Sequence, residues 1–311
     1  MSVADVLSGF QDFYGLEQQP FSLAPNTDFY VETQSHQECF NVLMYALASG
    51  EGFIKVTGEV GTGKTLLSRR LLNELDDEHF VSAYIPNPSL TPTALWRAIA
   101  HELSIDVNHI DDHQVQEKIQ KKLLLLASNH KKVVLIIDEA QCIPEDTLEA
   151  LRLISNLETE RQTLLQIVLF GQPELDVLLA TQRFRQLRQR ITYSAVLEPL
   201  APANLPHYIQ QRMMIAGYRG MPVFEDKAVK LMTQATSGIP RLINVIAQKS
   251  LLCAFGKGSE QVAVEHVKEA ISDTEGTRSF IRSSSSGIFS YWREGLLFLI
   301  LVVLVAMYEF S

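Results

Sequence analysis

Cysteine is scarce in this sequence, with three residues among 311. Cys39, Cys142 and Cys253 are odd in number and show no C-x-x-C spacing, which argues against a disulfide framework and against a zinc site. We therefore expect reduced cysteines in the core of an intracellular protein. Residues 1–11 also lack the basic and apolar regions of a secretory signal, so none is expected.

Positive charge is in deficit as well. Lys and Arg number 27 against 36 Asp and Glu, which gives a formal net charge of -9. Because phosphate backbones are bound mainly by clustered Lys and Arg, nucleic acid is not expected as a partner, although a local basic patch is still possible. The apolar content of 46% is enough for a sizeable core, most simply two domains and a tail.

A glycine-rich stretch is present at residues 58–65, which read GEVGTGKT and match the phosphate-loop pattern G-x-x-x-x-G-K-T. The pattern requires a strand before it and a helix after it, and the sequence predicts a strand over 52–57 and a helix over 64–75. Glycines allow successive backbone N–H groups to point at phosphate oxygens, and the helix adds the positive end of its dipole. The expected nucleotide-binding residues are Gly58, Glu59, Val60, Gly61, Thr62, Gly63, Lys64, Thr65 and Leu66.

An acidic pair, Asp138 and Glu139, follows the apolar run at 133–137. Open α/β sheets bind their ligands at the carboxyl ends of strands, where this pair would lie. We expect Lys64 to reach the β- and γ-phosphates of ATP, and Thr65 and Asp138 to hold Mg²⁺. Glu139 would polarise the attacking water. An acidic pair alone is a weak signal, but together with the phosphate loop it predicts an ATP and Mg²⁺ site.

Strand and helix signals alternate between about residue 50 and residue 200. Strands are predicted over 52–57, 81–85, 131–137, 164–170 and 191–197, and helices over 64–75, 91–103 and 114–128. Continuous apolar runs are typical of parallel strands buried on both faces, so we expect an α/β fold with a parallel sheet flanked by helices. Four further helices, over 205–216, 227–236, 241–253 and 262–271, predict a small all-helical domain.

The domain boundaries follow from these signals. We expect an N-terminal linker segment at 1–34, an α/β nucleotide-binding domain at 35–202, a helical domain at 203–272, a polar Ser-rich linker at 273–287 and a C-terminal apolar helix at 288–311. The apolar run from 295 to 308 is shorter than the roughly 20 residues of a full membrane span. Tyr291 and Trp292 lie where an interfacial aromatic belt would be. We expect a membrane anchor there, and whether it crosses the bilayer or lies on it is left open.

Several motifs together resemble the AAA+ ATPases of the ExeA, or general secretion pathway A, type. The resemblance rests on GEVGTGKT, LIIDEAQ, LFGQPEL and SGIPRLIN, with the opening FYGLEQQPFSLAPNTDFYV, and covers roughly residues 10–272. It implies an AAA+ P-loop fold with a helical lid, and ATP hydrolysis by a ring-forming homo-oligomer. It also implies pilus or secretion assembly proteins as partners, MSHA-type pili among them, at the cytoplasmic face of the bacterial inner membrane.

The resemblance further implies roles for single residues. Gln172 matches the polar sensor position between the two motif strands, and Arg241 matches the second sensor, an arginine that folds back on the nucleotide. Arg188 and Arg190 match arginines that complete a neighbouring subunit's site. The ordinary alternatives stay open, namely a helix cap for Gln172, a solvated surface arginine for Arg241, and a basic helix face for the pair.

Two other functions remain possible from the sequence. One is a DNA-associated AAA+ ATPase of the transposition-regulator or replication-loader type, against which the acidic balance and the apolar tail argue. The other is a nucleotide-switched scaffold with little turnover, against which Glu139 argues.

Overall fold

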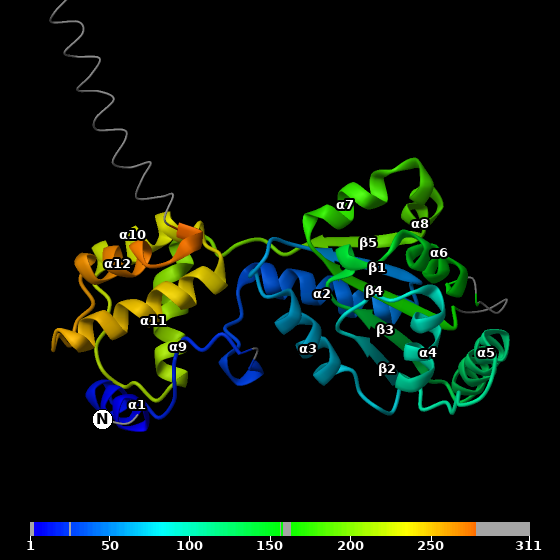
Figure 1. Ribbon diagram of the computed structural model, residues 1–311, viewed down its shortest axis with the longest axis horizontal. Helices are drawn as coiled ribbons and strands as arrows, with labels where there is room; N and C mark the ends of the chain where they lie inside the picture. Colours follow the sequence, from blue (N-terminus) through cyan, green and yellow to red (C-terminus); the bar gives the residue numbers. More distant parts are fainter. Residues whose placement is uncertain (1–2, 25, 156, 158–162, 278–311) are drawn as a thin grey trace, which may run out of the picture. The chain divides into compact units, whose positions relative to one another are not determined.

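The computed structural model describes residues 3–24, 26–155, 157 and 163–277. Contacts between residues divide the chain into two compact units. Figure 1 labels the helices and strands of both. We call the first the sheet unit, which contains residues 24–204 together with Ile239–Arg241. The second, the helical unit, contains residues 3–23, 205–238 and 242–277 of the described part.

In the described residues of the sheet unit, five parallel strands form one sheet in the order β2-β3-β4-β1-β5. Their bounds are β1 Phe53–Thr57, β2 Phe80–Ile85, β3 Lys132–Ile137, β4 Leu165–Gly171 and β5 Ile191–Val196. The central strand β4 is buried throughout, and β3 is buried from its second residue onward. The continuous apolar runs therefore form the central strands, which confirms the predicted parallel sheet.

Helices cover both faces of this sheet. They are α2 Gln34–Ser49, α3 Lys64–Glu74, α4 Pro92–Glu102, α5 Asp112–Ser128, α6 Glu145–Ile154, α7 Pro173–Ala180 and α8 Arg185–Arg190. One core lies between the sheet and α2 and α3, and the other lies between the sheet and α4 to α8. Successive residues of β3 alternate between them, so Val134 faces the first core and Leu135 the second.

Local capping explains where two of these helices begin. The Thr91 side chain accepts a hydrogen bond from the backbone N–H of Ala94, and Pro92 occupies the first turn of α4. At the start of α5, Asp111 and Gln114 form a reciprocal capping box. These side chains satisfy N–H groups that the first helical turn leaves unpaired, which is why the sequence located both starts closely.

The helical unit contains α1 Val3–Tyr14, α9 Leu205–Ile215, α10 Asp226–Thr236 and α12 Val264–Ser272. It also contains α11 Pro240–Gly256 from Leu242 onward, because the first two residues of that helix belong to the sheet unit. The segment expected to be a linker thus contains a helix. Phe10 of α1 packs edge-on against Phe255 with ring centroids 5.8 Å apart, and the Tyr14 hydroxyl donates to the carbonyl of Leu251 over 3.1 Å. Aromatic packing onto α11 therefore joins the two ends of the described chain in one unit.

The cysteines differ in their burial. Cys142 is exposed, so it is not a core cysteine, whereas Cys39 is buried. The predicted membrane anchor at 288–311 lies outside the described residues. Within the part that is described, no helix combines the length and the apolar character that a bilayer crossing requires.

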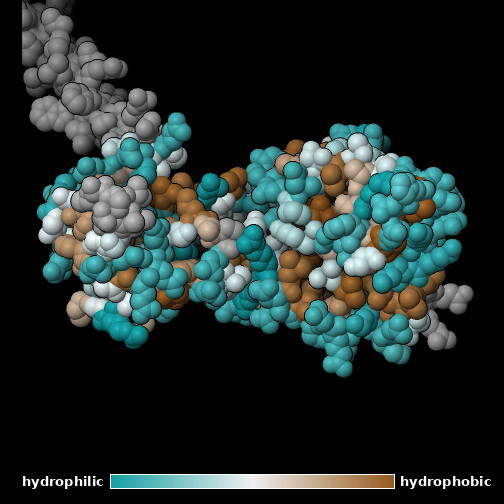
Figure 2. All heavy atoms as spheres, turned by 60° about the horizontal axis from the view of Figure 1, so that its bottom comes forward, coloured by the Kyte–Doolittle hydropathy of each residue, from teal (hydrophilic) through white to brown (hydrophobic). Residues whose placement is uncertain are grey.

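Figure 2 shows that hydrophilic side chains cover much of the visible face of the sheet unit, interrupted by hydrophobic patches.

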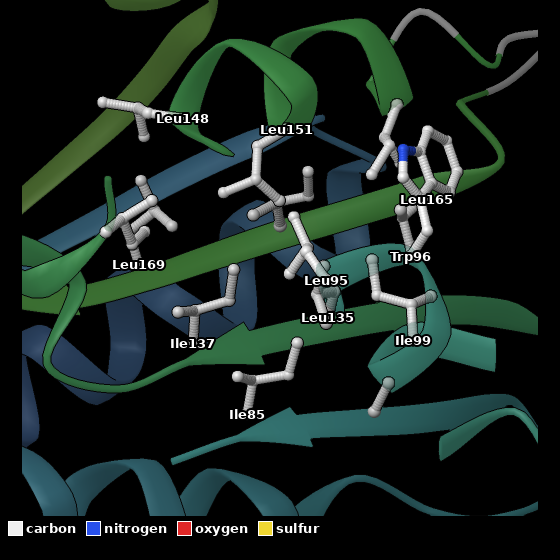
Figure 3. Close-up of a cluster of buried hydrophobic side chains, with 14 of the residues drawn as sticks. Ile85, Leu95, Trp96, Ile99, Leu135, Ile137, Leu148, Leu151, Leu165 and Leu169 are labelled. Atoms are coloured by element: carbon white, nitrogen blue, oxygen red, sulfur yellow. The ribbon is translucent and has the colours of Figure 1, made fainter. Parts of the chain in front are cut away.

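The core between the sheet and α4 to α8 should govern the stability of the sheet unit. Leu135 is completely buried there, beside Leu95, Ile99 and Ile137 (Figure 3). Leu135→Ala is expected to lower the free energy of unfolding by about 2–5 kcal/mol, because the removed atoms leave a cavity in a packed core. Urea titration measures this, with fluorescence of Trp96 in the same core as the signal.

Val177→Ala is the matched control, because Val177 is 72% exposed. Its unfolding free energy is expected to stay within about 0.5 kcal/mol of that of the unaltered chain. Equal losses in the two variants would contradict the assignment of this core.

Candidate nucleotide site

The functional side chains gather at one edge of the sheet. In a parallel sheet, the carboxyl ends of all strands share an edge. The phosphate loop follows β1, Asp138 and Glu139 follow β3, and Gln172 follows β4. Since β4 lies between β1 and β3, Gln172 lies between the phosphate loop and the acidic pair. This is the edge at which open α/β sheets bind ligands.

The phosphate loop requires its glycines. Gly61 and Gly63 have φ angles of 85° and 106°, in the left-handed region that favours glycine. A Cβ on Gly63 would lie 2.8 Å from Nε2 of His36, and a Cβ on Gly58 would lie 2.7 Å from the carbonyl oxygen of Leu197. Gly63 is the N-cap of α3, so the first N–H groups of that helix have no intrahelical partner and can bind an anion.

Lys64 is held inside this loop. Its side chain is 6% exposed and donates to the carbonyl oxygens of Gly58 over 2.7 Å and Glu59 over 2.9 Å. Burial lowers the pKa of the Lys64 ammonium, while the carboxylates of Glu139 and Asp138 oppose that shift. A buried ammonium surrounded by loop carbonyls and acids gains a stronger partner when phosphate oxygens enter the loop.

Thr65 and Asp138 join the loop to β3. The Thr65 hydroxyl donates to Oδ2 of Asp138 over 2.7 Å, and the backbone N–H of Glu139 donates to Oδ1 over 2.9 Å. Asp138 is 2% exposed, and burial raises the pKa of its carboxyl, opposed by these two hydrogen bonds. A hydroxyl and a carboxylate oxygen at this separation suit Mg²⁺, and a cation would offset the cost of the buried charge.

Glu139 is surrounded by amide groups. Its backbone has φ 51° and ψ 40°, an uncommon conformation for a residue other than glycine. Its Oε2 accepts hydrogen bonds from Nε2 of Gln141 over 2.5 Å and from Nε2 of Gln172 over 3.1 Å. Gln172 is the N-cap residue of α7, but its side chain forms no capping hydrogen bond. The structure thus directs the Gln172 side chain to the acidic pair.

Arg241 is distant from the phosphate loop in the sequence but lies beside it in the structure. Its backbone N–H donates to the carbonyl of Gly61 over 3.1 Å, and a Cβ on Gly61 would lie 2.7 Å from its Cβ. The residue itself is exposed. Both its backbone and its side-chain Cβ therefore border the loop.

Arg188 and Arg190 lie away from the other candidates. They belong to α8, which leads into the amino end of β5, at the sheet edge opposite to Asp138. Arg188 is exposed and donates to the carbonyl of Ala180 over 3.3 Å. Arg190 is half-buried and donates to the hydroxyl of Ser155 over 2.9 Å. Neither arginine can reach the phosphate loop of its own chain.

No role is predicted from the sequence for His36 or Gln141, which both contact the site. His36 of α2 packs beneath Gly63, and Gln141 contacts both Glu139 and the backbone of Gln172. No motif marks His36, whose contact depends on the packing of α2 against the loop. The sequence does contain a signal for Gln141, because this residue follows Glu139 by two positions in the turn after β3.

Comparison with known proteins agrees with this geometry. The family model described as AAA domain matches residues 47–179. General secretion pathway protein A of Aeromonas hydrophila is 39% identical over 270 residues, which are 86% of this chain and 49% of that protein. The chain is a member of the general secretion pathway A family of AAA+ proteins. This confirms the resemblance found in the motifs. The chain spans about half the length of that relative.

Solved structures show the same fold. The ORC2 protein of Aeropyrum pernix matches with a TM-score of 0.60 at 17% identity, over 83% of this chain and 72% of that chain. Cdc6p of Pyrobaculum aerophilum matches with a TM-score of 0.60 at 18% identity, over 82% and 70%. RuvB of Thermotoga maritima matches with a TM-score of 0.51 at 16% identity, over 85% and 78%. At these identities the matches show a shared fold alone.

The burial of His36 predicts a pH dependence of stability. Its ring is 5% exposed, with Nδ1 2.6 Å from the Thr33 hydroxyl. Burial lowers its pKa to about 4, assisted by the Arg70 cation and opposed by Glu32. Between pH 7 and pH 4.5 the unfolded chain takes up a proton at His36 and the folded chain does not. Stability therefore falls as the pH falls, and this histidine accounts for about 2 kcal/mol of the loss.

The comparison of His36→Gln with His101→Gln measures this contribution, since the His101 side chain is 87% exposed. Urea unfolding of the sheet unit at both pH values is expected to show a smaller loss in His36→Gln than in the unaltered chain. His101→Gln should behave like the unaltered chain. The same pH dependence in all three proteins would remove His36 from this account.

Proposed function

We propose that this chain is a Mg²⁺-dependent ATPase. The observation that best supports the proposal is the convergence of Lys64, Thr65, Asp138 and Glu139 at one sheet edge. A buried ammonium, a hydroxyl hydrogen-bonded to a carboxylate, and a second carboxylate beside them are groups that phosphoryl transfer to water uses. Membership of an AAA+ family supports the same reading.

Each of these groups has a defined task in the proposed reaction. Lys64 and the N–H groups of the phosphate loop bind the β- and γ-phosphates of ATP. Thr65 and Asp138 provide oxygen ligands for Mg²⁺, which when bound neutralises charge on the phosphate oxygens. Glu139 orients the attacking water and accepts its proton, and Gln172 holds the Glu139 carboxylate toward that water. Arg241 borders the loop at Gly61, from where its guanidinium can contact the phosphates.

The proposed active form is a homo-oligomer, most simply a ring. Arg188 and Arg190 lie at the sheet edge opposite to the phosphate loop, so any part they take in hydrolysis would be at the site of a neighbouring copy. A guanidinium supplied in trans stabilises the charge that develops on the transferred phosphoryl group. Arg188 is the better candidate of the two, because it is exposed and donates one long hydrogen bond to Ala180, whereas Arg190 is half-buried and donates to both oxygens of Ser155.

The proposed setting is the cytoplasmic face of the bacterial inner membrane. The Aeromonas hydrophila relative is named for the general secretion pathway. We extend this to assistance in assembling a secretion apparatus or a type IV pilus of the MSHA kind. Residues 288–311 would provide the membrane anchor. Pilus and secretion assembly proteins are the proposed partners.

Glu139→Gln tests hydrolysis directly. The full chain carrying this substitution is expected to bind ATP with unchanged affinity and to hydrolyse it at least about a hundredfold more slowly, because the amide cannot accept a proton from water. Phosphate release and binding of a fluorescent ATP analogue measure the two quantities. The control is Glu74→Gln, at an exposed residue on α3, which should leave both unchanged.

Two outcomes would contradict the proposal. Full hydrolysis by Glu139→Gln would exclude Glu139 as the base. Negligible hydrolysis by the unaltered chain, despite tight ATP binding, would favour a nucleotide-switched scaffold. The assay is repeated with duplex DNA and with lipid vesicles, and stimulation by DNA alone would favour the DNA-associated alternative.

Mixing of two inactive variants tests action between copies. Arg188→Ala is expected to lower turnover by about a thousandfold, and Glu139→Gln is inactive for a different reason. In a mixed oligomer, some sites combine an intact Glu139 with an intact Arg188 from the neighbouring copy, so the mixture should recover activity. Arg185→Ala, at another exposed arginine of α8, serves as the control and should keep its activity. A mixture as inactive as its components would contradict a finger in trans.

A further inference from the structure

Gln141 connects the ends of two strands through both atoms of its carboxamide. It lies in the single turn Ala140–Cys142 that follows β3. Its Nε2 donates to Oε2 of Glu139 over 2.5 Å, and its Oε1 accepts from the backbone N–H of Gln172 over 2.9 Å. A backbone N–H can only donate and a carboxylate can only accept, so one orientation of the amide satisfies both partners. The contacts therefore define which atom faces which strand.

The contacts close into a ring of three residues. Gln172, whose backbone N–H is bound by Gln141, donates through its own Nε2 to the same Oε2 of Glu139 over 3.1 Å. The Glu139 carboxylate is thus attached to β3 through the main chain and to the end of β4 through two amides. A free glutamate side chain has several rotamers, and this ring restricts it to one direction.

The ring also distinguishes the two oxygens of the carboxylate. Both amide donors bind Oε2 of Glu139. Among the described residues, no hydrogen bond reaches Oε1 of Glu139. One oxygen is therefore occupied by the protein, and the other is available to accept a hydrogen bond from water.

We infer that Gln141 is a positioning residue for the hydrolytic carboxylate: it fixes Glu139 so that Oε1 faces the attacking water, and it keeps the Gln172 side chain in the same ring. This inference rests on the proposed ATP hydrolysis. Gln141 acts through Glu139 and Gln172 and need not touch the nucleotide. Its loss should therefore lower the rate of the chemical step and leave ATP binding unchanged.

Gln141→Leu and Gln141→Glu separate the two halves of this connection. Leucine has a similar volume and forms neither hydrogen bond. Glutamate can still accept from the N–H of Gln172 but cannot donate to Glu139. Both full-length variants are expected to show kcat reduced about tenfold to a hundredfold, the effect of losing a hydrogen bond to a charged group. KM and the affinity for a fluorescent ATP analogue should stay within about twofold of the values for the unaltered chain.

A double variant identifies the residue through which Gln141 acts. If Gln141 works by positioning Glu139, then Gln141→Leu should have no further effect on kcat in a chain that already carries Glu139→Gln. Gln120→Leu, at an exposed position of α5, is the matched control and should leave kcat unchanged in both backgrounds. Retained ATP affinity in each variant shows that the site is still folded.

The outcomes separate this inference from the proposed function. Turnover by the unaltered chain that is lost in Glu139→Gln supports the proposed function. If kcat is then unchanged in either Gln141 variant, or falls further in the double variant, the inference is overturned while the proposed function stands. A raised KM with unchanged kcat would also overturn it, because that result indicates a role in binding. Absence of turnover in the unaltered chain would overturn both.

Discussion

The parallel alignment of the strands is the constraint on which the candidate site depends. It brings the carboxyl ends of β1, β3 and β4 to one edge, and the strand order sets β4 between the other two. Groups separated by more than a hundred residues, such as Thr65 and Gln172, then lie around one space. The alignment is held by apolar strands packed on both faces, so the chemistry of the edge depends on the packing of the interior.

Burial leaves the site electrostatically incomplete. It lowers the pKa of Lys64 and raises the pKa of Asp138, so the charged form of each group is penalised. Loop carbonyls, the Thr65 hydroxyl and a backbone N–H compensate in part. Phosphate oxygens and a divalent cation would supply the partners that the protein lacks. Burial disfavours the charged forms of Lys64 and Asp138 when they have no ligand. It therefore favours the binding of phosphate oxygens and a divalent cation, which are the ligands of an AAA+ site.

The sheet also separates two sets of functional groups. The phosphate loop, Asp138, Glu139 and the amide ring lie at the carboxyl edge, while Arg188 precedes β5 at the opposite edge. In the proposed oligomer, one chain would use its carboxyl edge as an active site and its opposite edge to complete the site of the next chain. Hydrolysis would then depend on how neighbouring copies contact one another.

The sequence by itself determined the strands, the phosphate loop and the acidic pair. Each depends on local spacing: apolar runs for buried strands, glycines for positive φ, and caps such as Thr91 and Asp111 for helix starts. Tertiary structure decided what local spacing cannot express. The packing of α1 onto α11, the position of His36 beneath Gly63 and the ring that joins Gln141 to Gln172 are contacts between distant segments. Such contacts depend on strand order and helix packing, which no single stretch of sequence encodes.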